Sequence, residues 1–374
     1  MKKIILTAQD FAYGPIGKLL DLVSHMENKF FELVFIGFGT SLQLAKKHKF
    51  SKVYKIDTEL SKNKNKLKNI VKDADLLISS MDLPSLEIAQ ELGIKNVWID
   101  CLFWFWDEIP KIAQKADLYI AEISINNKKN LKKFKKKINN LLMVNTILPK
   151  LNKKKVEKQV LISLGGAEAT HCYQIGKDTY FPFIMTEILL KYVDWSCFDK
   201  IYLATNQRIL SKLKGLFKKT KIIFCCLEHT KFVNTLSNSE VTLITPGLVT
   251  TQTAFYAKTP VLFLPASNNS QYLQLEEYRK EGLAKASVSL SDFIGKLDFS
   301  NKREAEANEM VINQISSIRN NTFVKKAIGD KIDKLLKDRN RWAQNAVNVG
   351  SNYIYKRGAN GAIQALRAIE SLMR

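Results

Sequence analysis

The chain has 374 residues and a net charge of +22, from 58 lysines and arginines against 36 aspartates and glutamates. This length is enough for two ordinary domains, and 46% hydrophobic with 25% charged residues is typical of globular proteins. Collagen-like, disulfide-framework and fully disordered classes are excluded. The apolar stretch from Ile4 to Leu6 is too short for a secretion signal, and no stretch reaches the length of a membrane-spanning helix. We therefore expect a cytoplasmic protein that at most associates peripherally with a membrane.

Cysteine and histidine usage argues against disulfides and against a zinc site. The five cysteines are an odd number, none forms a C-x-x-C pair, and the four histidines are scattered. We expect reduced thiols, no metal and no bound cofactor.

The positive charge is carried almost entirely by lysine. Only nine of the 58 cations are arginine, and none precedes Arg208. Because arginine is the side chain that forks onto phosphates and guanine edges, this bias disfavours nucleic acid as a partner. Anionic lipid or a diphosphate substrate suits a lysine-rich face better. The run Lys128–Lys137 is expected to be a solvated helix face, with a membrane-surface patch as the alternative.

Short apolar, β-branched runs alternate with helical patterns twice along the chain, which predicts two α/β domains with doubly wound, Rossmann-like parallel sheets. In the first half we expect strands at Ile4–Thr7, Phe31–Ile36, Val53–Ile56, Asp75–Ser79, Asn96–Asp100 and Leu118–Ala121, and helices near 15–27, 41–48, 61–72, 85–92 and 126–138. In the second half we expect strands at Val160–Leu164, Ile201–Ala204, Ile222–Cys225, Val241–Thr245 and Val261–Leu264.

The boundaries follow from composition. Pro149 and the lysine-rich run to Lys155 read as a linker, so we place an N-terminal domain at 1–150 and a C-terminal domain at 158–345. The remaining segment, 346–374, is helical and ends in Gly358–Met373. Its apolar residues recur at helical spacing, which indicates a helix that packs on a core. These residues are Ile363, Leu366, Ile369 and Leu372.

Loops that follow parallel strands are where ligands bind in α/β folds. After one strand come Gly165 and Gly166, whose backbone can approach a phosphate closely, although an ordinary tight turn explains such a pair equally well. Neither a P-loop nor a dinucleotide-binding glycine motif occurs.

A second loop carries a stronger signal. A buried strand ends at Pro246-Gly247, and a helix begins there among hydroxyl residues that include Thr250 and Thr251. Free backbone N–H groups at a helix N-terminus attract anions, phosphate above all. The alternative is that the threonines only cap the helix.

This region resembles the donor-binding domain of GT-B glycosyltransferases, in particular the bacterial group with the undecaprenyl-linked N-acetylglucosaminyltransferase of peptidoglycan synthesis. The resemblance rests on the Pro246-Gly247 loop, on Thr259-Pro260 thirteen residues beyond Gly247, and on the polar segment Asn268-Asn269-Ser270-Gln271. It implies two α/β domains facing across a cleft, with the last helix crossing back onto the first domain.

The resemblance also implies residue roles. Backbone groups of Gly247 and Leu248 and the Thr250 hydroxyl would hold the diphosphate of a nucleotide sugar, UDP- or dTDP-linked, with Gln271 facing the sugar. Gly165 and Gly166 match the family's other glycine loop. The segment Tyr13-Gly14-Pro15-Ile16-Gly17-Lys18 is similar to its acceptor loop, and the acceptor would be a small molecule or a lipid-linked one.

Two departures from the family pattern bear on chemistry. Thr253 stands where many members have a glutamate for the ribose hydroxyls, and Lys18 stands where the acceptor loop usually has histidine. A lysine with an ordinary pKa of about 10.4 is protonated at neutral pH and cannot act as a base. Candidate bases are therefore Asp10, Asp100 and Asp107, of which Asp10 is our first choice; its alternative role is a helix cap.

An aromatic segment surrounds the other two carboxylates. Three tryptophans and two phenylalanines occur within Trp98–Trp106, including Trp104. They could stack on a sugar or hydrophobic acceptor, or equally fill the core below it.

Three functions compete. The leading one is an inverting, metal-independent glycosyltransferase. A nucleotide-sugar hydrolase or 2-epimerase on the same fold is the second. A non-catalytic protein that binds a polyanion or a membrane through its lysine-rich face is the third.

Overall fold

The computed structural model describes residues 1–26, 31–124, 127–152 and 156–374. Parts of three predicted segments lie outside these residues, namely the end of the helix at 15–27, the start of the helix at 126–138 and the end of the linker. The chain divides into two compact units, one made of Met1–Lys150 with Ile354–Arg374 and the other of Leu151–Tyr353. The predicted last boundary, at 346, falls inside a helix, and the change of unit comes at Ile354.

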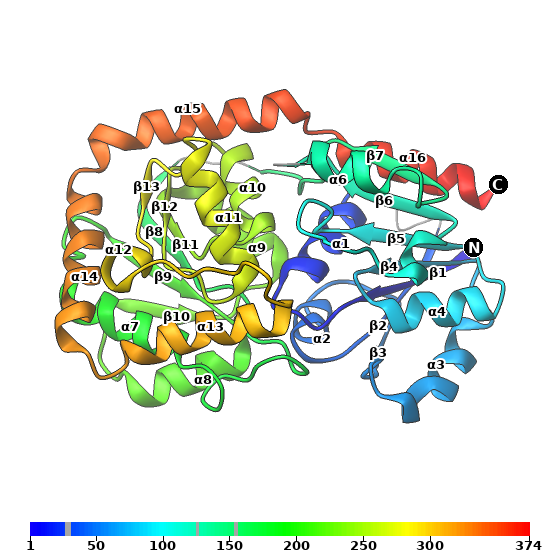
Figure 1. Ribbon diagram of the computed structural model, residues 1–374, viewed down its shortest axis with the longest axis horizontal. Coiled ribbons are helices and arrows are strands. Elements are labelled where there is room, and N and C mark those ends of the chain that lie inside the picture. Colours follow the sequence, from blue (N-terminus) through cyan, green and yellow to red (C-terminus); the bar gives the residue numbers. More distant parts are fainter. Residues whose placement is uncertain (27–30, 125–126, 153–155) are drawn as a thin grey trace. The chain divides into compact units, whose positions relative to one another are not determined.

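The first unit is built on a parallel sheet with the order β3-β2-β1-β4-β5-β6-β7 (Figure 1). Its strands are β1 (Lys2–Ala8), β2 (Phe31–Gly37), β3 (Lys52–Lys55), β4 (Leu76–Ser80), β5 (Asn96–Asp100), β6 (Leu118–Glu122) and β7 (Leu141–Val144). Its helices are α1 (Gly14–Val23), α2 (Gly39–Ala45), the 3-10 turn η2 (Ser61–Asn63), α3 (Lys64–Val71), α4 (Leu83–Glu91), α5 (Lys111–Gln114), α6 (Asn127–Phe134) and α16 (Gly361–Met373).

Both faces of this sheet are covered, which is why its strands read as continuous apolar runs. Successive residues of β1 enter different cores: Ile4 and Leu6 pack on one face, and Ile5 packs on the other. The last helix, α16, belongs to the first of these cores. Its buried residues are Ala362, Ala365, Leu366, Ile369 and Met373, so the buried stripe is displaced from the predicted one, and Ile363 is exposed.

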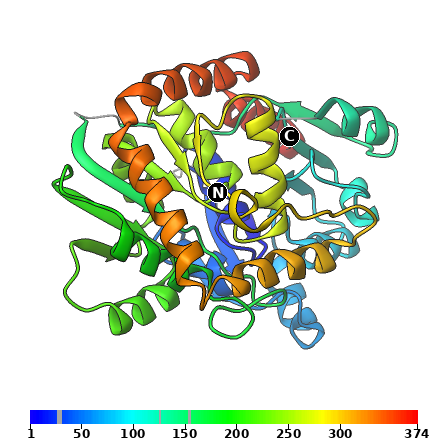
Figure 2. The same ribbon diagram turned by 60° about the vertical axis from the view of Figure 1, so that its left-hand side comes forward.

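The second unit is built on a parallel sheet with the order β10-β9-β8-β11-β12-β13 (Figure 1). Figure 2 shows the same unit, coloured green to orange, from a second direction. Its strands are β8 (Glu157–Ser163), β9 (Lys200–Ala204), β10 (Ile222–Cys225), β11 (Ser239–Ile244), β12 (Val261–Phe263) and β13 (Ala286–Ser287). Its helices are α7 (Phe181–Tyr192), α8 (Gln207–Leu216), α9 (His229–Asn238), α10 (Leu248–Tyr256), α11 (Asn269–Lys280), α12 (Ser291–Ile294), α13 (Glu304–Ser317), α14 (Thr322–Lys337) and most of α15 (Arg339–Arg357).

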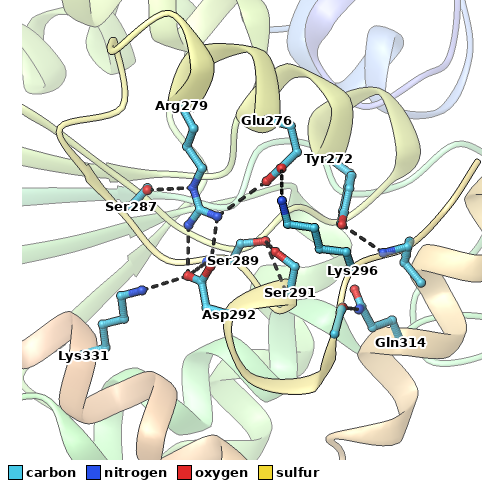
Figure 3. A network of polar contacts seen from close by, with 12 residues as sticks. Tyr272, Glu276, Arg279, Ser287, Ser289, Ser291, Asp292, Lys296, Gln314 and Lys331 are labelled. Carbon is cyan, nitrogen blue, oxygen red and sulfur yellow. Dashed lines mark hydrogen bonds and ion pairs between the residues drawn. The ribbon is translucent and has the colours of Figure 1, made fainter.

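A charged network holds the helices beyond β12 together. Asp292 of α12 accepts hydrogen bonds from the guanidinium of Arg279 on α11, at 3.0 and 2.9 Å, and from the ammonium of Lys331 on α14, at 2.8 Å (Figure 3). Glu276, one turn before Arg279, also pairs with Lys296 at 3.5 Å. Through these contacts the polar cluster joins α11, α12 and α14, as Figure 3 shows.

Candidate functional site

Each sheet has a switch point, where the chain reverses the direction in which it adds strands. In the second unit the chain adds β9 and β10 on one side of β8, then returns to add β11, β12 and β13 on the other side. After β8 and β11, which are neighbours, the chain continues to opposite sides of the sheet, and ligands bind at such places in α/β sheets. An ideal Cβ placed on Gly165, after β8, would lie 3.9 Å from the hydroxyl of Thr245, after β11. The two predicted donor loops thus meet at one edge.

Helix α10 begins at this switch point with its backbone donors uncapped. Gly247 is the residue before its first turn, no side chain caps it, and its first turn has no acidic residue. By contrast α8, α11 and α14 each have an asparagine that accepts a backbone N–H at the helix start: Asn206, Asn268 and Asn321. Thr251, fully buried one turn into α10, has a hydroxyl for which the described residues offer no hydrogen-bond partner. The helix start therefore presents positive potential and unused donors.

The glycine pair after β8 opens a loop over residues 164–180, which ends where α7 begins. Gly165 has φ of +64° and Ala167 has φ of +49°, both in the left-handed region. The carbonyl of Gly165 accepts from the Thr205 hydroxyl at 3.4 Å, and the carbonyl of Gly166 accepts from the Asn206 amide at 2.6 Å. The glycine loop (residues 164–168) is thus anchored on the β9 side.

The predicted sugar-facing residue, Gln271, lies in the first turn of α11. Its side-chain oxygen accepts from the Ser267 N–H and hydroxyl, both at 2.9 Å, so its NH2 group points away from Ser267. Asn268 caps the same turn by accepting from the Gln271 N–H at 3.0 Å. This arrangement fixes the orientation of the Gln271 amide.

Thr253 occupies the position where the resemblance would place a ribose-binding glutamate. Its side chain is buried, and its hydroxyl donates to the Val249 carbonyl of the same helix at 2.9 Å. The Thr253 hydroxyl is thus engaged inside its own helix, and it does not take the place of a glutamate carboxylate at this position.

The first unit has its own switch point, between β1 and β4, and Asp10 lies in the loop after β1. Its carboxylate accepts from the Thr40 N–H at 2.6 Å and lies 2.7 Å from the Thr40 hydroxyl, so it caps the start of α2. It packs so closely on Gly39 that a Cβ there would lie 2.0 Å from the carboxylate, and Gly39 has φ of +51°. The capping role considered from the sequence is therefore present, and a catalytic role stays a prediction.

The predicted acceptor loop divides into exposed and buried parts. Tyr13 precedes α1, and Gly14 begins it with open space around the position of a Cβ. Lys18 is 1% exposed: its ammonium pairs with Glu122 at 2.8 Å and donates to the Ile147 carbonyl at 2.6 Å. The sequence analysis took Lys18 for an acceptor-binding residue, but its charge is neutralised inside the unit, where it ties α1 to β6.

The second predicted carboxylate, Asp100, is also internal. It accepts hydrogen bonds from the Leu102 N–H at 2.7 Å, from the Trp106 indole at 2.9 Å and from the Tyr119 hydroxyl. Burial, reinforced by the nearby charge of Glu122, raises the pKa of Asp100 to about 6 in spite of these donors. Asp100 therefore organises the aromatic loop that follows β5 instead of reaching an acceptor.

The aromatic loop after β5 is partly buried, and stacking on an acceptor stays a prediction. Phe103 is buried in the core, whereas Trp104 is half-buried beside Phe105. Asp107 is exposed, and its carbonyl accepts from the ammonium of Lys133 on α6. Asn130 of α6 donates to two carbonyls of the loop, which fixes its path.

Two features of the site were missed in the sequence. Glu168, in the glycine loop, is bonded to Asn206 and Arg208, and Asp82, after β4, lies 2% exposed among hydroxyl donors. Burial raises the pKa of Asp82. No periodicity marks such residues; only a carboxylate directly after a strand could have drawn attention to Asp82.

Metal ligands and membrane-spanning helices are both missing from the described residues. Within them, no cluster of three or more histidine, cysteine or acidic side chains could hold a metal ion. Across the same parts of the chain, no helix combines the length and apolar character needed to cross a membrane.

Comparisons with known proteins bear on the fold. No family model matches the sequence, and no curated protein matches it. Among solved structures, spinosyn forosaminyltransferase SpnP matches with a TM-score of 0.55 at 13% identity, over 100% of this chain and 99% of that one. A UGT transferase from Siraitia grosvenorii, in complex with UDP, matches with a TM-score of 0.53 at 11% identity, over 100% of both chains. The chain has the GT-B fold.

The same GT-B fold also occurs in a further match, a putative UDP-N-acetylglucosamine 2-epimerase from Listeria monocytogenes. Its TM-score is 0.52 at 14% identity, over 99% of this chain and 96% of that one. The predicted fold class, two doubly wound parallel α/β domains, is confirmed. At these identities the likeness establishes the fold alone, and the narrower resemblance to the undecaprenyl-linked transferase group stays a prediction.

Proposed function

We propose that the protein is a glycosyltransferase that moves a sugar from a nucleotide-diphosphate donor, UDP- or dTDP-linked, to an acceptor bound mainly by the first unit. The observation that carries the proposal is the uncapped start of α10 beside the glycine loop, at the switch point of the second sheet. The GT-B fold raises the expectation of a nucleotide-sugar substrate. The geometry of the site supplies the reason for a diphosphate.

Sugar transfer places negative charge on the leaving diphosphate as the anomeric bond breaks. The N–H groups of Leu248, Val249 and Thr250 and the partial positive charge of α10 stabilise that charge. Such fixed donors act without reorganisation in the transition state, where they contribute most. The proposal therefore assigns neutralisation of the leaving group to the helix and needs no metal ion for it.

The acceptor step balances with one carboxylate as base. An acceptor hydroxyl forms a bond to the anomeric carbon while the bond to the diphosphate oxygen breaks, and the hydroxyl proton passes to the base. We assign this role to Asp10. A one-step displacement of this kind inverts the anomeric centre.

A hydrolase or 2-epimerase is the second candidate, favoured by the 2-epimerase among the structural matches and by the absence of the ribose glutamate at Thr253. Incubating the protein with UDP-N-acetylglucosamine alone separates the two. Rapid release of free sugar, or formation of the C2 epimer, without an acceptor favours this reading over transfer.

The donor site is tested by Thr250→Glu, which places a carboxylate in the first turn of α10. Acidic residues there stabilise a helix by about 0.5 kcal/mol, so the variant should fold at least as well as the wild type. Repulsion of the diphosphate should weaken binding of UDP and dTDP roughly hundredfold or more in calorimetric titration. Binding is thus uncoupled from stability.

The matched control is Thr322→Glu, the same change at the start of α14, which Asn321 already caps. We expect it to bind nucleotides like the wild type. Wild-type affinity in Thr250→Glu, or no binding of UDP, dTDP or GDP to the wild type, would refute the proposal. Steeply salt-dependent binding to anionic vesicles that Thr250→Glu leaves intact would support the polyanion- or membrane-binding function instead.

A further inference from the structure

The glycine loop adopts a conformation that its own sequence does not favour. Ala167 has φ of +49°, which costs a residue with a Cβ about 1 kcal/mol. It is nevertheless buried, at 3% exposure. Backbone strain of this kind persists only where neighbouring groups enforce it. The groups that enforce it here lie at the start of α8.

The carbonyls of the glycine loop point toward β9. Gly165 O is bonded by Thr205, and Gly166 O by Asn206, both of which directly follow β9. In a trans peptide the C=O and the following N–H point in opposite directions. The N–H groups of Gly166 and Ala167 therefore point away from β9. On the other side of β8 lies β11, whose following loop leads into α10.

Asn206 is the hub of this arrangement. It is fully buried, and its side-chain oxygen caps α8 by accepting from the Ile209 N–H at 2.9 Å. Its NH2 group donates to the Gly166 carbonyl at 2.6 Å and to a carboxylate oxygen of Glu168 at 2.9 Å. The side chain thus makes three hydrogen bonds, two as donor and one as acceptor, and the amide must take this orientation to make all of them.

Glu168 completes the clamp from the loop side. It is 8% exposed. Its second oxygen accepts from the Ile175 N–H at 3.3 Å and from the guanidinium of Arg208. Its two oxygens are thus both occupied by protein donors, which argues against a direct contact with substrate. Arg208, whose side chain is 46% exposed, balances the charge.

We infer that Glu168 and Asn206 are positioning residues for the donor site: they hold the glycine loop with the Gly166 and Ala167 N–H groups directed at the donor's diphosphate. This inference rests on the proposed function. It assigns to the second unit a two-part anion site, one part the start of α10 and the other the clamped loop.

The experiment uses variants that keep the helix cap. In Asn206→Asp the new side chain still accepts from Ile209, because aspartate is as good a cap as asparagine. Its other oxygen, however, faces the Gly166 carbonyl and the Glu168 carboxylate, so the peptide is released. In Glu168→Gln the new NH2 group faces the NH2 group of Asn206, and the clamp loses that bond.

The double variant Glu168→Gln/Asn206→Asp separates positioning from stability. The glutamine NH2 can donate to the aspartate, which restores the bond between positions 168 and 206. The Gly166 carbonyl still faces a carboxylate oxygen and remains unsupported. We expect the double variant to regain most of the thermal stability lost by the single variants, but not the affinity for nucleotide.

Binding of UDP and dTDP is measured by calorimetry and unfolding by scanning calorimetry, on the full chain. Asn206→Asp and the double variant should bind roughly tenfold or more weakly than the wild type. Matched controls are Asn321→Asp, at the cap of α14, and Glu187→Gln, whose carboxylate pairs with Lys325 on α14. Both controls should bind like the wild type.

Two results would overturn the inference. One is wild-type affinity in Asn206→Asp, and the other is an affinity that returns together with stability in the double variant, as a purely structural role requires. Either result leaves the proposed function standing if Thr250→Glu abolishes binding. Absence of nucleotide binding to the wild type would instead remove the proposed function and this inference together.

Discussion

The two switch points share a topology and differ in chemistry. In each unit the first strand lies in the sheet between strands added on one side and strands added later on the other. In the second unit this edge presents backbone N–H groups and hydroxyls, from Gly247 and Thr250 among others. In the first unit the loops at this edge contain the carboxylates of Asp10 and of Asp82, the latter buried. The same topology therefore carries backbone donors and hydroxyls at one switch point and carboxylates at the other.

The contrast extends to the surroundings of the carboxylates. Asp82 accepts from the hydroxyls of Thr58, at 3.0 Å, and Ser85, at 2.7 Å. Hydroxyl donors do not supply full charges, so burial dominates and raises the pKa of Asp82. In the second unit Glu168 and Asp292 each face a guanidinium. Asp82 is thus held by hydroxyl donors, whereas Glu168 and Asp292 are held by guanidinium groups.

The largest expected effect is loss of transfer in Asp10→Asn, which tests whether the first edge carries the chemistry. Asparagine can still accept from the Thr40 N–H, so α2 keeps its cap. A missing general base lowers the turnover of sugar transfer about hundred- to ten-thousandfold. UDP affinity should not change, because the N–H groups proposed to bind the diphosphate belong to the second unit. Steady-state rates and calorimetry measure the two quantities separately.

The control for this prediction is Thr40→Val, which removes the hydroxyl contact to Asp10 and retains the carboxylate. It should lower stability slightly and retain most of the activity. If Thr40→Val loses transfer as completely as Asp10→Asn does, Asp10 acts only as a cap and the comparison between the two edges fails.

Much of the fold was predictable because buried parallel strands have a strong local signature. Runs such as Ile4–Thr7 and Val160–Leu164 are apolar on both faces, and helical patterns separate them, which is sufficient for an α/β assignment. The sequence analysis missed β7 and β13. Each is too short to be distinguished from a buried helical or loop segment, since only pairing with a neighbouring strand defines it.

The site was predictable only where local backbone geometry decides it. Gly247 and Thr250 reveal an exposed helix start, because glycine and hydroxyl residues mark such positions locally. Side chains whose partners are far along the chain gave no such signal. Lys18 meets Glu122, and Glu168 meets Asn206, at separations that no periodicity encodes. Thr253 is a different case, because its hydroxyl bonds to the Val249 carbonyl four residues earlier, a local contact that helical threonines commonly make.

The next prediction sharpens the contrast through pH. Burial raises the pKa of Asp100 above its unfolded value, so the folded protein binds this proton more tightly, and stability falls as pH rises between about 4 and 6. The change in the pKa of Asp100 from 3.8 to about 6 corresponds to a loss of about 3 kcal/mol of folding stability, and this loss is complete above pH 6. Asp100→Asn removes the ionisable group and keeps an acceptor for Leu102 and Trp106.

Asp100→Asn should therefore have a higher free energy of unfolding than the wild type. This advantage should be about 2 kcal/mol larger at pH 8 than at pH 4. Urea unfolding at the two pH values, followed by tryptophan fluorescence, measures this difference. A difference that does not vary with pH would mean that the Tyr119 and Trp106 donors fully offset the burial of the charge.

The smallest effect is expected from Asp292→Asn in the second unit, and it has the opposite sign. Burial alone would raise the pKa of Asp292, but the donors Arg279, Lys331 and the Ser289 N–H outweigh it and lower the pKa to about 2 (Figure 3). The stabilisation is thus present above pH 4 and lost as pH falls through 2. Since the cluster is partly exposed and Arg279 keeps Glu276, we expect a loss of about 1 kcal/mol at pH 7. On acidification the stability lost by Asp292→Asn should shrink towards zero. The stability gained by Asp100→Asn should shrink as well, so the two variants differ from the wild type in opposite senses. The same sign and pH dependence in both variants would contradict the opposite effects assigned to the surroundings of Asp100 and Asp292.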